Sequence, residues 1–338
     1  MKKVFVTGIT GLLGTNVVIK LLKDGYFVIA LVRQKSRYYG QEDENLQLVE
    51  GDLFTDVSVY MKEADFVIHI AAETSQSLLS YAEYRKTNYD VVVHLFSEAV
   101  EAGVKKFLFV STANTMGYGN LAEPGNEKSP QKYPFTKSLY AKSKVEAESF
   151  LLRNNKTTEV VILNPTFMIG AYDRKPSSGK IIFWAWKKKL VFYPKGGKNF
   201  VHVEDAAQGV INAIKKGKNG EKYLLTNENL KYKDFFKKVN VITKQNPLLL
   251  PLPGFILIFL GIIGDLLRFL NIKTSLSTPN MKALRIDNYY TGQKSIDELE
   301  IQYQPIEKAI TDAINFFENK EYAISKVSLK PQVRLQQN

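Results

Sequence analysis

The chain has 338 residues, enough to bury one large α/β domain or two lobes, and its 45 % hydrophobic and 24 % charged residues are typical of a globular protein. It has no cysteine, which excludes disulfide bonds and thiolate chemistry. Met1 leads directly into a predicted strand, so we expect no signal peptide and a cytoplasmic protein. The net charge of +12 is scattered along the chain, so we expect no nucleic-acid partner.

The N-terminal segment carries the strongest signal. Residues 2–7 have the pattern of a buried strand, and a turn containing Gly8, Gly11 and Gly14 leads into an apolar helical pattern at 12–22. A strand, a glycine-rich turn and a helix form the arrangement that holds a dinucleotide pyrophosphate. Glycine permits the tight turn, the approach of phosphate and close packing of helix on strand, while N–H groups at the helix start favour the anion.

The first half of the chain alternates between strand and helix patterns. Strands are predicted at residues 26–32, 46–50, 65–70, 106–111 and 159–164, and helices at 83–102 and 139–153. Such alternation predicts an α/β fold, a doubly wound parallel sheet of the Rossmann type with right-handed crossovers. Ligands of these sheets bind at the carboxyl ends of the strands.

The second half is less regular. Its clearest predicted elements are a strand at 200–203, a helix at 205–216, a strand at 222–225 and a last helix at 306–319. We therefore predict a dinucleotide-binding domain, a smaller, mostly helical C-terminal substrate lobe, and a tail. The domain comprises residues 1–170 and 200–225, the lobe residues 171–199 and 226–322, and the tail residues 323–338.

One strongly apolar run lies in the predicted lobe. Residues 255–263 contain no charge, and Asp265 and Arg268 follow soon after. The run is too short to span a bilayer, which needs about 20 residues. We expect a buried helix of the smaller lobe, with a membrane-surface contact or an apolar substrate mouth as the alternatives.

The candidate catalytic residues gather after the strand at 106–111. Tyr140 and Lys144 lie one turn apart on one face of the helix predicted at 139–153. Three other Tyr/Lys pairs have the same spacing, but one lies beside a proline and two lie outside the α/β region. Ser111 and Thr112 stand at the carboxyl end of the strand, so hydroxyl, tyrosine and lysine converge at the ligand-binding edge.

Taken together, these motifs resemble the extended short-chain dehydrogenase/reductase family, also called the NAD-dependent epimerase/dehydratase family. The matching segments, in order, are residues 7–14, 51–53, 69–72, 111–112, 140–144, 164–165 and 200–205. Within that family the chain looks most like the dihydroflavonol-4-reductase-like branch. It is particularly similar to members named hopanoid-associated sugar epimerases, through residues 164–170 and 175–179.

The resemblance implies a role for each candidate residue. Tyr140 would be the general acid/base, Thr112 rather than Ser111 would hydrogen bond the carbonyl oxygen, and Lys144 would bind the nicotinamide ribose. Lys144 and the oxidised nicotinamide would also lower the pKa of the phenol from about 10. Besides the three glycines, the implied cofactor contacts are Thr10, Leu12, Leu13, Asp52, Leu53, Ala71, Ala72, Ser111, Tyr140, Lys144, Pro165 and Phe167.

Two of these residues have ordinary alternative roles. Asp52 could serve only as a helix cap, and Thr112 only as a hydroxyl that closes the end of a strand. His69, His94 and His202 are far apart and lack metal-ligand spacing, so we predict no metal site.

The end of the second predicted strand bears on the choice of cofactor. Family members that prefer NAD usually carry an acid there for the ribose 2′-hydroxyl, whereas this chain has Val32 followed by Arg33 and Lys35. The two cations could clamp a 2′-phosphate, so NADP(H) is favoured and NAD(H) remains possible. The alternative is that both are solvated surface cations.

Other departures from the family pattern narrow the reaction. Ala113 and Asn114 stand where 4,6-dehydratases carry an Asp-Glu pair, and Lys198 stands where sugar-nucleotide epimerases often carry arginine. We predict an NAD(P)-dependent oxidoreductase that reduces a ketone or aldehyde, or oxidises the alcohol, through Thr112, Tyr140 and Lys144. The alternatives are an NAD-dependent nucleoside-diphosphate-sugar epimerase and, in another class, a non-catalytic dinucleotide-sensing protein.

The resemblance also implies a homodimer. Its interface would be formed by the helices at 83–102 and 139–153, with apolar surface supplied by Val91, Val92, Leu95 and Phe96. The alternative is that these four side chains pack only on the protein's own sheet.

Overall fold

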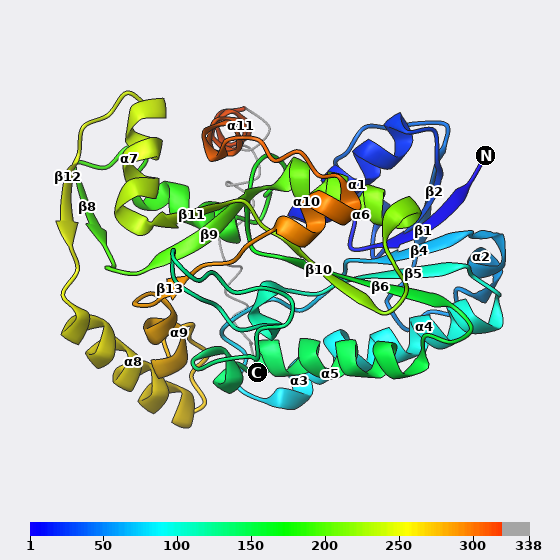
Figure 1. Cartoon of the computed structure of the whole chain (residues 1–338), viewed down its shortest axis with the longest axis horizontal. Coiled ribbons are helices and arrows are strands. Elements are labelled where there is room, and N and C mark those ends of the chain that lie inside the picture. The colour runs from blue at the N-terminus through cyan, green and yellow to red at the C-terminus, as the bar shows by residue number, and fades with distance from the viewer. Residues whose placement is uncertain (320–338) are drawn as a thin grey trace, which may run out of the picture.

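A seven-stranded parallel sheet forms the centre of the computed structural model, which describes residues 1–319 (Figure 1). The predicted tail at 323–338 lies outside the described residues. The strand order is β10-β6-β5-β4-β1-β2-β3. The strands are β1 (Lys3–Thr7), β2 (Phe27–Val32), β3 (Leu46–Glu50), β4 (Phe66–His69), β5 (Lys106–Val110), β6 (Glu159–Pro165) and β10 (Glu221–Leu225). The order reverses between β1 and β4, which is where sheets of this kind bind ligands.

Helices cover both faces of this sheet (Figure 1). On one face lie α1 (Leu12–Lys23) and α6 (Val203–Lys216), and on the other lie α2 (Ser58–Glu63), α4 (Val91–Glu101) and α5 (Leu139–Asn154). Because both sides of the sheet are covered, the central strands are almost wholly apolar, and every residue of β5 is buried. The predicted doubly wound parallel sheet is confirmed.

The helix predicted at 83–102 forms with one irregularity. α3 (Tyr81–Arg85) continues through a π-helical turn, Lys86–Asp90, into α4. The four apolar residues predicted to supply a dimer surface are 0 to 3 % exposed, because they pack on the protein's own sheet: Val91, Val92, Leu95 and Phe96. That part of the prediction is wrong. A dimer through these helices would have to use their other faces, and it stays a prediction.

Smaller strands lie beside the main sheet. β9 (Gly197–His202) pairs with β7 (Phe167–Ile169), β11 (Glu228–Lys231) and β13 (Asp287–Asn288), and β8 (Leu190–Tyr193) pairs with β12 (Leu248–Pro251). Of these strands, the sequence predicts only the part of β9 at 200–203. Segments of two to four residues, as in β13 and β8, are too short to show a two-residue periodicity.

The remaining helices complete this part of the molecule. They are α7 (Tyr232–Ile242), α8 (Gly254–Phe269), α9 (Thr278–Ala283), α10 (Gln293–Leu299) and α11 (Ile306–Glu318). α7 and α11 pack around β9 in a core of their own, in which the Phe200 and Phe235 rings stack with centroids 4.3 Å apart.

The apolar run at 255–263 forms part of α8, but the helix is not buried. Leu257, Gly261 and Gly264 are its buried residues, whereas Phe255 and Phe259 are 71 % and 62 % exposed. The prediction of a buried helix is therefore wrong. Where nearly every residue is apolar, periodicity cannot show which side of a helix faces solvent. In the part of the chain that the structure describes, no helix is long and apolar enough to cross a membrane.

Candidate active site

The glycine-rich turn between β1 and α1 packs so closely on neighbouring backbone that only glycine fits at Gly8 and Gly14. Gly8 has φ +80°, and a Cβ placed on it would lie 2.5 Å from the Ala71 nitrogen. A Cβ on Gly14 would overlap the Gly8 carbonyl oxygen. Thr15, which the sequence analysis did not single out, donates to the carbonyls of Ile9 at 2.8 Å and Gly11 at 3.0 Å. The turn is therefore fixed by packing and hydrogen bonds.

The first turn of α1 is open to an anion. Gly11 is its N-cap and offers no side-chain acceptor, and no acidic residue lies in the first turn. Thr10 and Gly11 are exposed and Leu12 is partly buried, while Leu13 is 4 % exposed and packs in the core. Leu13 can therefore offer only its backbone N–H. These features fit the pyrophosphate of a dinucleotide.

The end of β2 presents two cations to solvent. Val32 is buried, while Arg33 and Lys35 are exposed and, among residues 1–319, make no ion pair. The Glu50 carboxylate accepts from the Lys35 backbone N–H at 2.8 Å. The sequence motifs did not indicate Glu50. Its carboxylate ties the end of β3 to the loop that follows β2.

Asp52 closes a turn after β3. Its Oδ1 accepts from the Phe54 N–H at 2.7 Å, and its own N–H donates to the Thr55 hydroxyl at 2.9 Å. The helix-cap alternative is wrong, because α2 begins only at Ser58. Leu53 is partly buried against the core, and the pair Asp52 and Leu53 lies just beyond the carboxyl end of β3. Their contact with a cofactor stays a prediction.

The end of β4 is held by a buried polar chain. Ala71 and Ala72 are partly exposed, and the Ala71 N–H donates to the Thr7 hydroxyl at 3.3 Å. That hydroxyl also lies 2.8 Å from Nδ1 of His69. Burial, and secondarily the charge of Lys144, lowers the pKa of His69 to about 3. His69 is therefore neutral at physiological pH and fixes the backbone on which the two alanines lie.

Thr112 and Tyr140 meet at the carboxyl end of β5. The Thr112 side chain lies beside the Tyr140 phenol, close enough to lower its pKa. Thr112 Oγ1 also accepts from the Asn114 N–H at 3.3 Å, so the strand-end alternative describes part of its role. Burial raises the pKa of Tyr140 to about 12, while the Thr112 side chain opposes that rise. Tyr140 is thus a protonated phenol before any ligand binds.

Lys144 is held on β5, and its predicted effect on the pKa of Tyr140 together with the oxidised nicotinamide stays a prediction. Its Nζ donates to the Val110 carbonyl at 2.8 Å and lies 3.9 Å from the centroid of the Phe109 ring. The ammonium is directed at β5 rather than at the phenol. Burial lowers the pKa of Lys144 to about 7, and the negative charge of Glu148 partly offsets this.

Glu148 is a further residue of this site that the sequence motifs did not indicate. It is 1 % exposed, and its carboxylate accepts hydrogen bonds from the side chains of Ser111, Thr115, Asn164 and Lys222. Its place one turn beyond Lys144 on α5 was the available signal. Because the Ser111 hydroxyl is committed to Glu148, the adjacent hydroxyl of Thr112 is the one that reaches Tyr140.

Pro165 and Phe167 lie where β6 gives way to β7. Pro165 is buried, while Phe167 is partly exposed and packs edge-to-face on Phe200 at 5.7 Å. The Lys198 ammonium lies 4.2 Å from the centroid of the Phe167 ring and pairs with no carboxylate within residues 1–319. Burial lowers the pKa of Lys198 to about 8.

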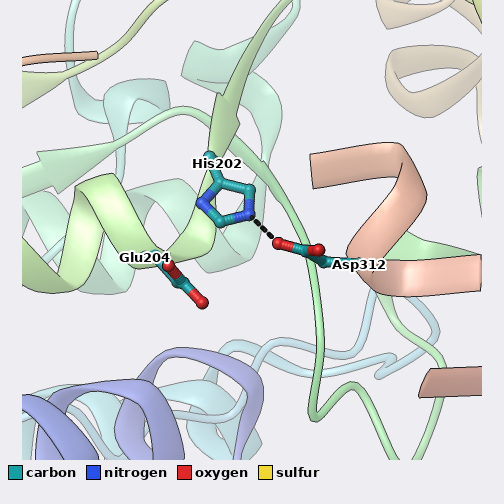
Figure 2. A group of neighbouring side chains, drawn as sticks. All are labelled: His202, Glu204 and Asp312. Carbon is teal, nitrogen blue, oxygen red and sulfur yellow. Dashed lines mark hydrogen bonds and ion pairs between the residues drawn. The ribbon is translucent and has the colours of Figure 1, made fainter. Parts of the chain in front are cut away.

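The structure also groups three side chains with metal-binding chemistry, which histidine spacing did not indicate (Figure 2). His202 at the end of β9, Glu204 in the first turn of α6 and Asp312 on α11 place ligand atoms within 4.8 Å of one another. His202 Nε2 lies 3.1 Å from Asp312 Oδ2, which also accepts from Lys308 Nζ at 2.9 Å. Lys308 already pairs with the Asp312 carboxylate. The His202–Asp312 contact links the end of β9 to α11. The absence of a metal stays a prediction.

The decisive comparison is with a family model. The model described as the NAD dependent epimerase/dehydratase family matches residues 4–226. The chain belongs to this family. The match runs from β1 to the end of β10, so it contains the whole parallel sheet and every predicted cofactor residue.

Individual members of the family agree with this membership. A protein of Synechocystis sp. with the provisional name dihydroflavonol 4-reductase is 29 % identical over 94 % of this chain and 95 % of that protein. Sterol-4-alpha-carboxylate 3-dehydrogenase, decarboxylating, of Dictyostelium discoideum is 30 % identical over 75 % and 81 %, respectively. The structure of dTDP-glucose 4,6-dehydratase from Bacillus anthracis in complex with NAD has a TM-score of 0.73 at 17 % identity, covering 95 % and 98 %.

These relatives place the chain among the enzymes of the family. They carry the names of reductases, dehydrogenases and dehydratases, and the chain is an NAD(P)-dependent oxidoreductase of the extended short-chain dehydrogenase/reductase type. The predicted fold and family are therefore confirmed, and the alternative of a non-catalytic sensing protein is not supported.

Proposed function

We propose that this enzyme reduces a ketone or aldehyde, or oxidises the matching alcohol, with Thr112, Tyr140 and Lys144 as its triad. The observation that carries the proposal is the placement of Thr112 beside the Tyr140 phenol at the carboxyl end of β5, one helical turn from Lys144. This edge also holds the glycine-rich turn, whose geometry fits a dinucleotide. Ala113 and Asn114 follow Thr112, so the acid pair that dehydration needs is missing.

Each member of the triad has a separate task. The Tyr140 phenol, protonated because its pKa is about 12, donates its proton to the carbonyl oxygen during reduction. The Thr112 hydroxyl holds that oxygen in place as negative charge develops. Lys144 Nζ, now on the Val110 carbonyl, can turn to the ribose of the cofactor. The nicotinamide, when bound, supplies the hydride.

We further propose NADP(H) as the preferred cofactor. Val32 leaves no acid at the end of β2, and the exposed, unpaired side chains of Arg33 and Lys35 can meet a 2′-phosphate. Glu50 favours NAD(H) instead, because its carboxylate lies beside the Lys35 backbone and would repel that phosphate. Because two cations and one carboxylate lie near the expected position of the 2′-phosphate, the local charge favours NADP(H).

The substrate class that we favour is an apolar carbonyl compound. One relative is named as a sterol dehydrogenase. In this chain, Arg268 of the apolar helix α8 donates to the Leu78 carbonyl at 2.7 Å, in the loop that follows Ala71 and Ala72. Phe183 and Trp186, by contrast, stack on each other inside the core around β9, so they do not line a substrate site, whereas Trp184 is exposed.

A nucleoside-diphosphate-sugar epimerase remains the second candidate. The observation in its favour is Lys198, whose ammonium has no carboxylate partner among the described residues and could meet a substrate phosphate. A lysine binds phosphate as a point charge and lacks the two-pronged geometry of arginine, so this support is weaker than an arginine would give.

A panel assay with the purified enzyme separates the two candidates. We expect NADPH consumption with aromatic or alicyclic ketones and aldehydes, and only weak binding of UDP and dTDP in calorimetry. Lys198→Ala serves as the comparison variant, because it should weaken diphosphate binding without affecting an uncharged ketone. Tight diphosphate binding that depends on Lys198, with no activity on any simple carbonyl compound, would favour the epimerase.

A further inference from the structure

The outer face of α8 exposes apolar side chains along most of the length of the helix. It consists of six apolar side chains that are 47 to 83 % exposed, namely Phe255, Ile258, Phe259, Ile262, Leu266 and Phe269. Their spacing of three and four residues places them on one side of the helix. A surface helix of a globular protein normally packs such an apolar stripe against the core. In α8 the stripe faces solvent instead.

The inner face of α8 fixes this orientation. Gly261 and Gly264 face the segment that leads into α9, and a Cβ on Gly261 would lie 3.0 Å from the Thr278 backbone. A Cβ on Gly264 would overlap the Leu276 carbonyl. Asp265, the one acid of the helix, accepts from the Thr278 N–H at 3.1 Å. Close packing leaves no room for large side chains to rotate inward.

Neighbouring strands extend the exposed apolar surface. β12 leads directly into α8, and β12 and β8 lie along the same side of the molecule as the helix (Figure 1). Leu248 of β12 pairs with Leu190 of β8, and they are 61 % and 43 % exposed. Phe192, two residues along β8, is 52 % exposed. Exposed apolar side chains are therefore also present on the strand pair from which the chain enters α8.

Three unpaired cations lie near this helix. Within residues 1–319, no ion pair is made by Lys195, which follows the end of β8 where that strand pairs with Pro251, by Lys282 of α9, or by Arg285. The Arg285 guanidinium adjoins the start of α8, since a Cβ on Gly254 would lie 3.2 Å from its Nε. Apolar side chains rimmed by cations match the chemistry of an anionic lipid surface.

The same charges argue against a second copy of the chain as the occupant. A symmetric dimer places the same patch of each subunit against the other. Docking two copies here would bring both sets of unpaired cations together, in a protein that already carries a net charge of +12. An anionic surface is attracted by the cations that repel a second copy.

The α8–α9 hairpin is also tied to the catalytic end of the main sheet. Arg268 donates to the carbonyls of Leu78 at 2.7 Å and Gln76 at 3.4 Å, and Lys273 pairs with Glu83 at 3.0 Å. Arg268 thus reaches the loop between β4 and α3, and Lys273 reaches the first turn of α3. A partner bound to α8 therefore lies beside the segment that follows Ala71 and Ala72.

We propose that the outer face of α8 binds the surface of an anionic phospholipid bilayer. The helix lies in the plane of the interface with its phenylalanine, isoleucine and leucine side chains among the acyl chains. Lys195, Lys282 and Arg285 contact the lipid phosphates. This binding does not depend on the reaction that the enzyme catalyses.

Vesicle sedimentation with the full-length protein tests the proposal. We expect binding to vesicles of phosphatidylcholine mixed with phosphatidylglycerol, little binding to phosphatidylcholine alone, and weakening by added salt. Phe255→Ser combined with Phe259→Ser should reduce binding by at least about tenfold. The matched control, Phe54→Ser with Leu121→Ser, removes two exposed apolar side chains that lie far from α8 in the sequence and should change nothing.

The variants remain interpretable because their side chains are exposed. The double phenylalanine variant should keep the melting temperature and NADPH affinity of the wild type. Lys282→Glu with Arg285→Glu should weaken binding to the anionic vesicles only. Absence of binding by the wild type, or equal binding by wild type and the Phe255/Phe259 variant, would overturn the proposal. A dimer that the Phe255/Phe259 variant abolishes, without any vesicle binding, would assign the face to a second copy.

Discussion

Burial sets the protonation of the residues at the carboxyl edge of the sheet. It raises the pKa of Tyr140 to about 12 and lowers the pKa of Lys144 to about 7 and of His69 to about 3. The phenol therefore holds its proton at neutral pH, while His69 carries none. Sequence motifs placed these residues, but they did not reveal Glu148, because a single carboxylate has no motif and its importance depends on which side chains fold around it.

Arg33 should decide the choice of cofactor. We predict that NADPH binds at least about tenfold more tightly than NADH, which corresponds to about 1.4 kcal/mol. Arg33→Ala should remove most of that difference by weakening NADPH alone. Arg37→Ala, which changes another exposed arginine in the same loop, is the control. Fluorescence titration of both cofactors measures the effect, and equal affinities in the wild type would refute the 2′-phosphate role.

His69 should make stability depend on pH. An unfolded chain protonates this histidine below its ordinary pKa of 6.5, whereas the folded protein does so only near 3. Above pH 6.5 the histidine is neutral in both states, so it does not lower the free energy of unfolding there. As the pH falls from 6.5 towards 3, the free energy of unfolding decreases by up to about 1.4 kcal/mol per pH unit.

Urea unfolding between pH 4 and pH 7 measures this dependence. His69→Gln should flatten the pH dependence in that window relative to the wild type. Identical slopes for the wild type and His69→Gln would show that His69 does not contribute.

At the scale of elements, α5 is held to the sheet by one buried carboxylate. Glu148 pairs with Lys222 of β10 at 2.6 Å and accepts from Asn164 of β6 at 2.8 Å. Through these contacts it fixes the helix that carries Tyr140 and Lys144. The position of the catalytic residues thus depends on contacts between elements that are distant in sequence.

Glu148→Ala should therefore destabilise the fold strongly. Removing one partner of a buried pair costs about 3–5 kcal/mol, and here two hydroxyls and an amide also lose an acceptor. Glu101→Ala, at the exposed end of α4, should change the free energy of unfolding little. Denaturant unfolding compares the two, and a loss below about 1 kcal/mol for Glu148→Ala would contradict this role.

The elements that the sequence predicted share one property. The central strands of the main sheet are buried on both faces and the main flanking helices are long, so each gives a sustained pattern, as β5 and α5 show. The short strands around β9 give no such pattern, and they form because neighbouring segments pair in three dimensions. The exposure of α8 was equally hidden, since it follows from two glycines that pack on the segment before α9.

At the scale of the whole molecule, the predicted site lies at one edge of one sheet. The glycine-rich turn follows β1, the two alanines follow β4, and the triad begins at the end of β5. Parallel strands bring these ends together, which is why the sequence could indicate the site without a structure. The region that selects the substrate lacks such a rule, because it is built from short strands and helices with no shared motif.

Single-turnover oxidation of NADPH by a ketone from the active panel tests the central claim most directly. We predict that Tyr140→Phe lowers this rate by at least about 100-fold while NADPH affinity stays within about twofold, because only the transferred proton is lost. Tyr84→Phe, which changes a ring 6.5 Å from Tyr140, should retain the rate. A Tyr140→Phe enzyme that kept more than about a tenth of the wild-type rate would contradict the account.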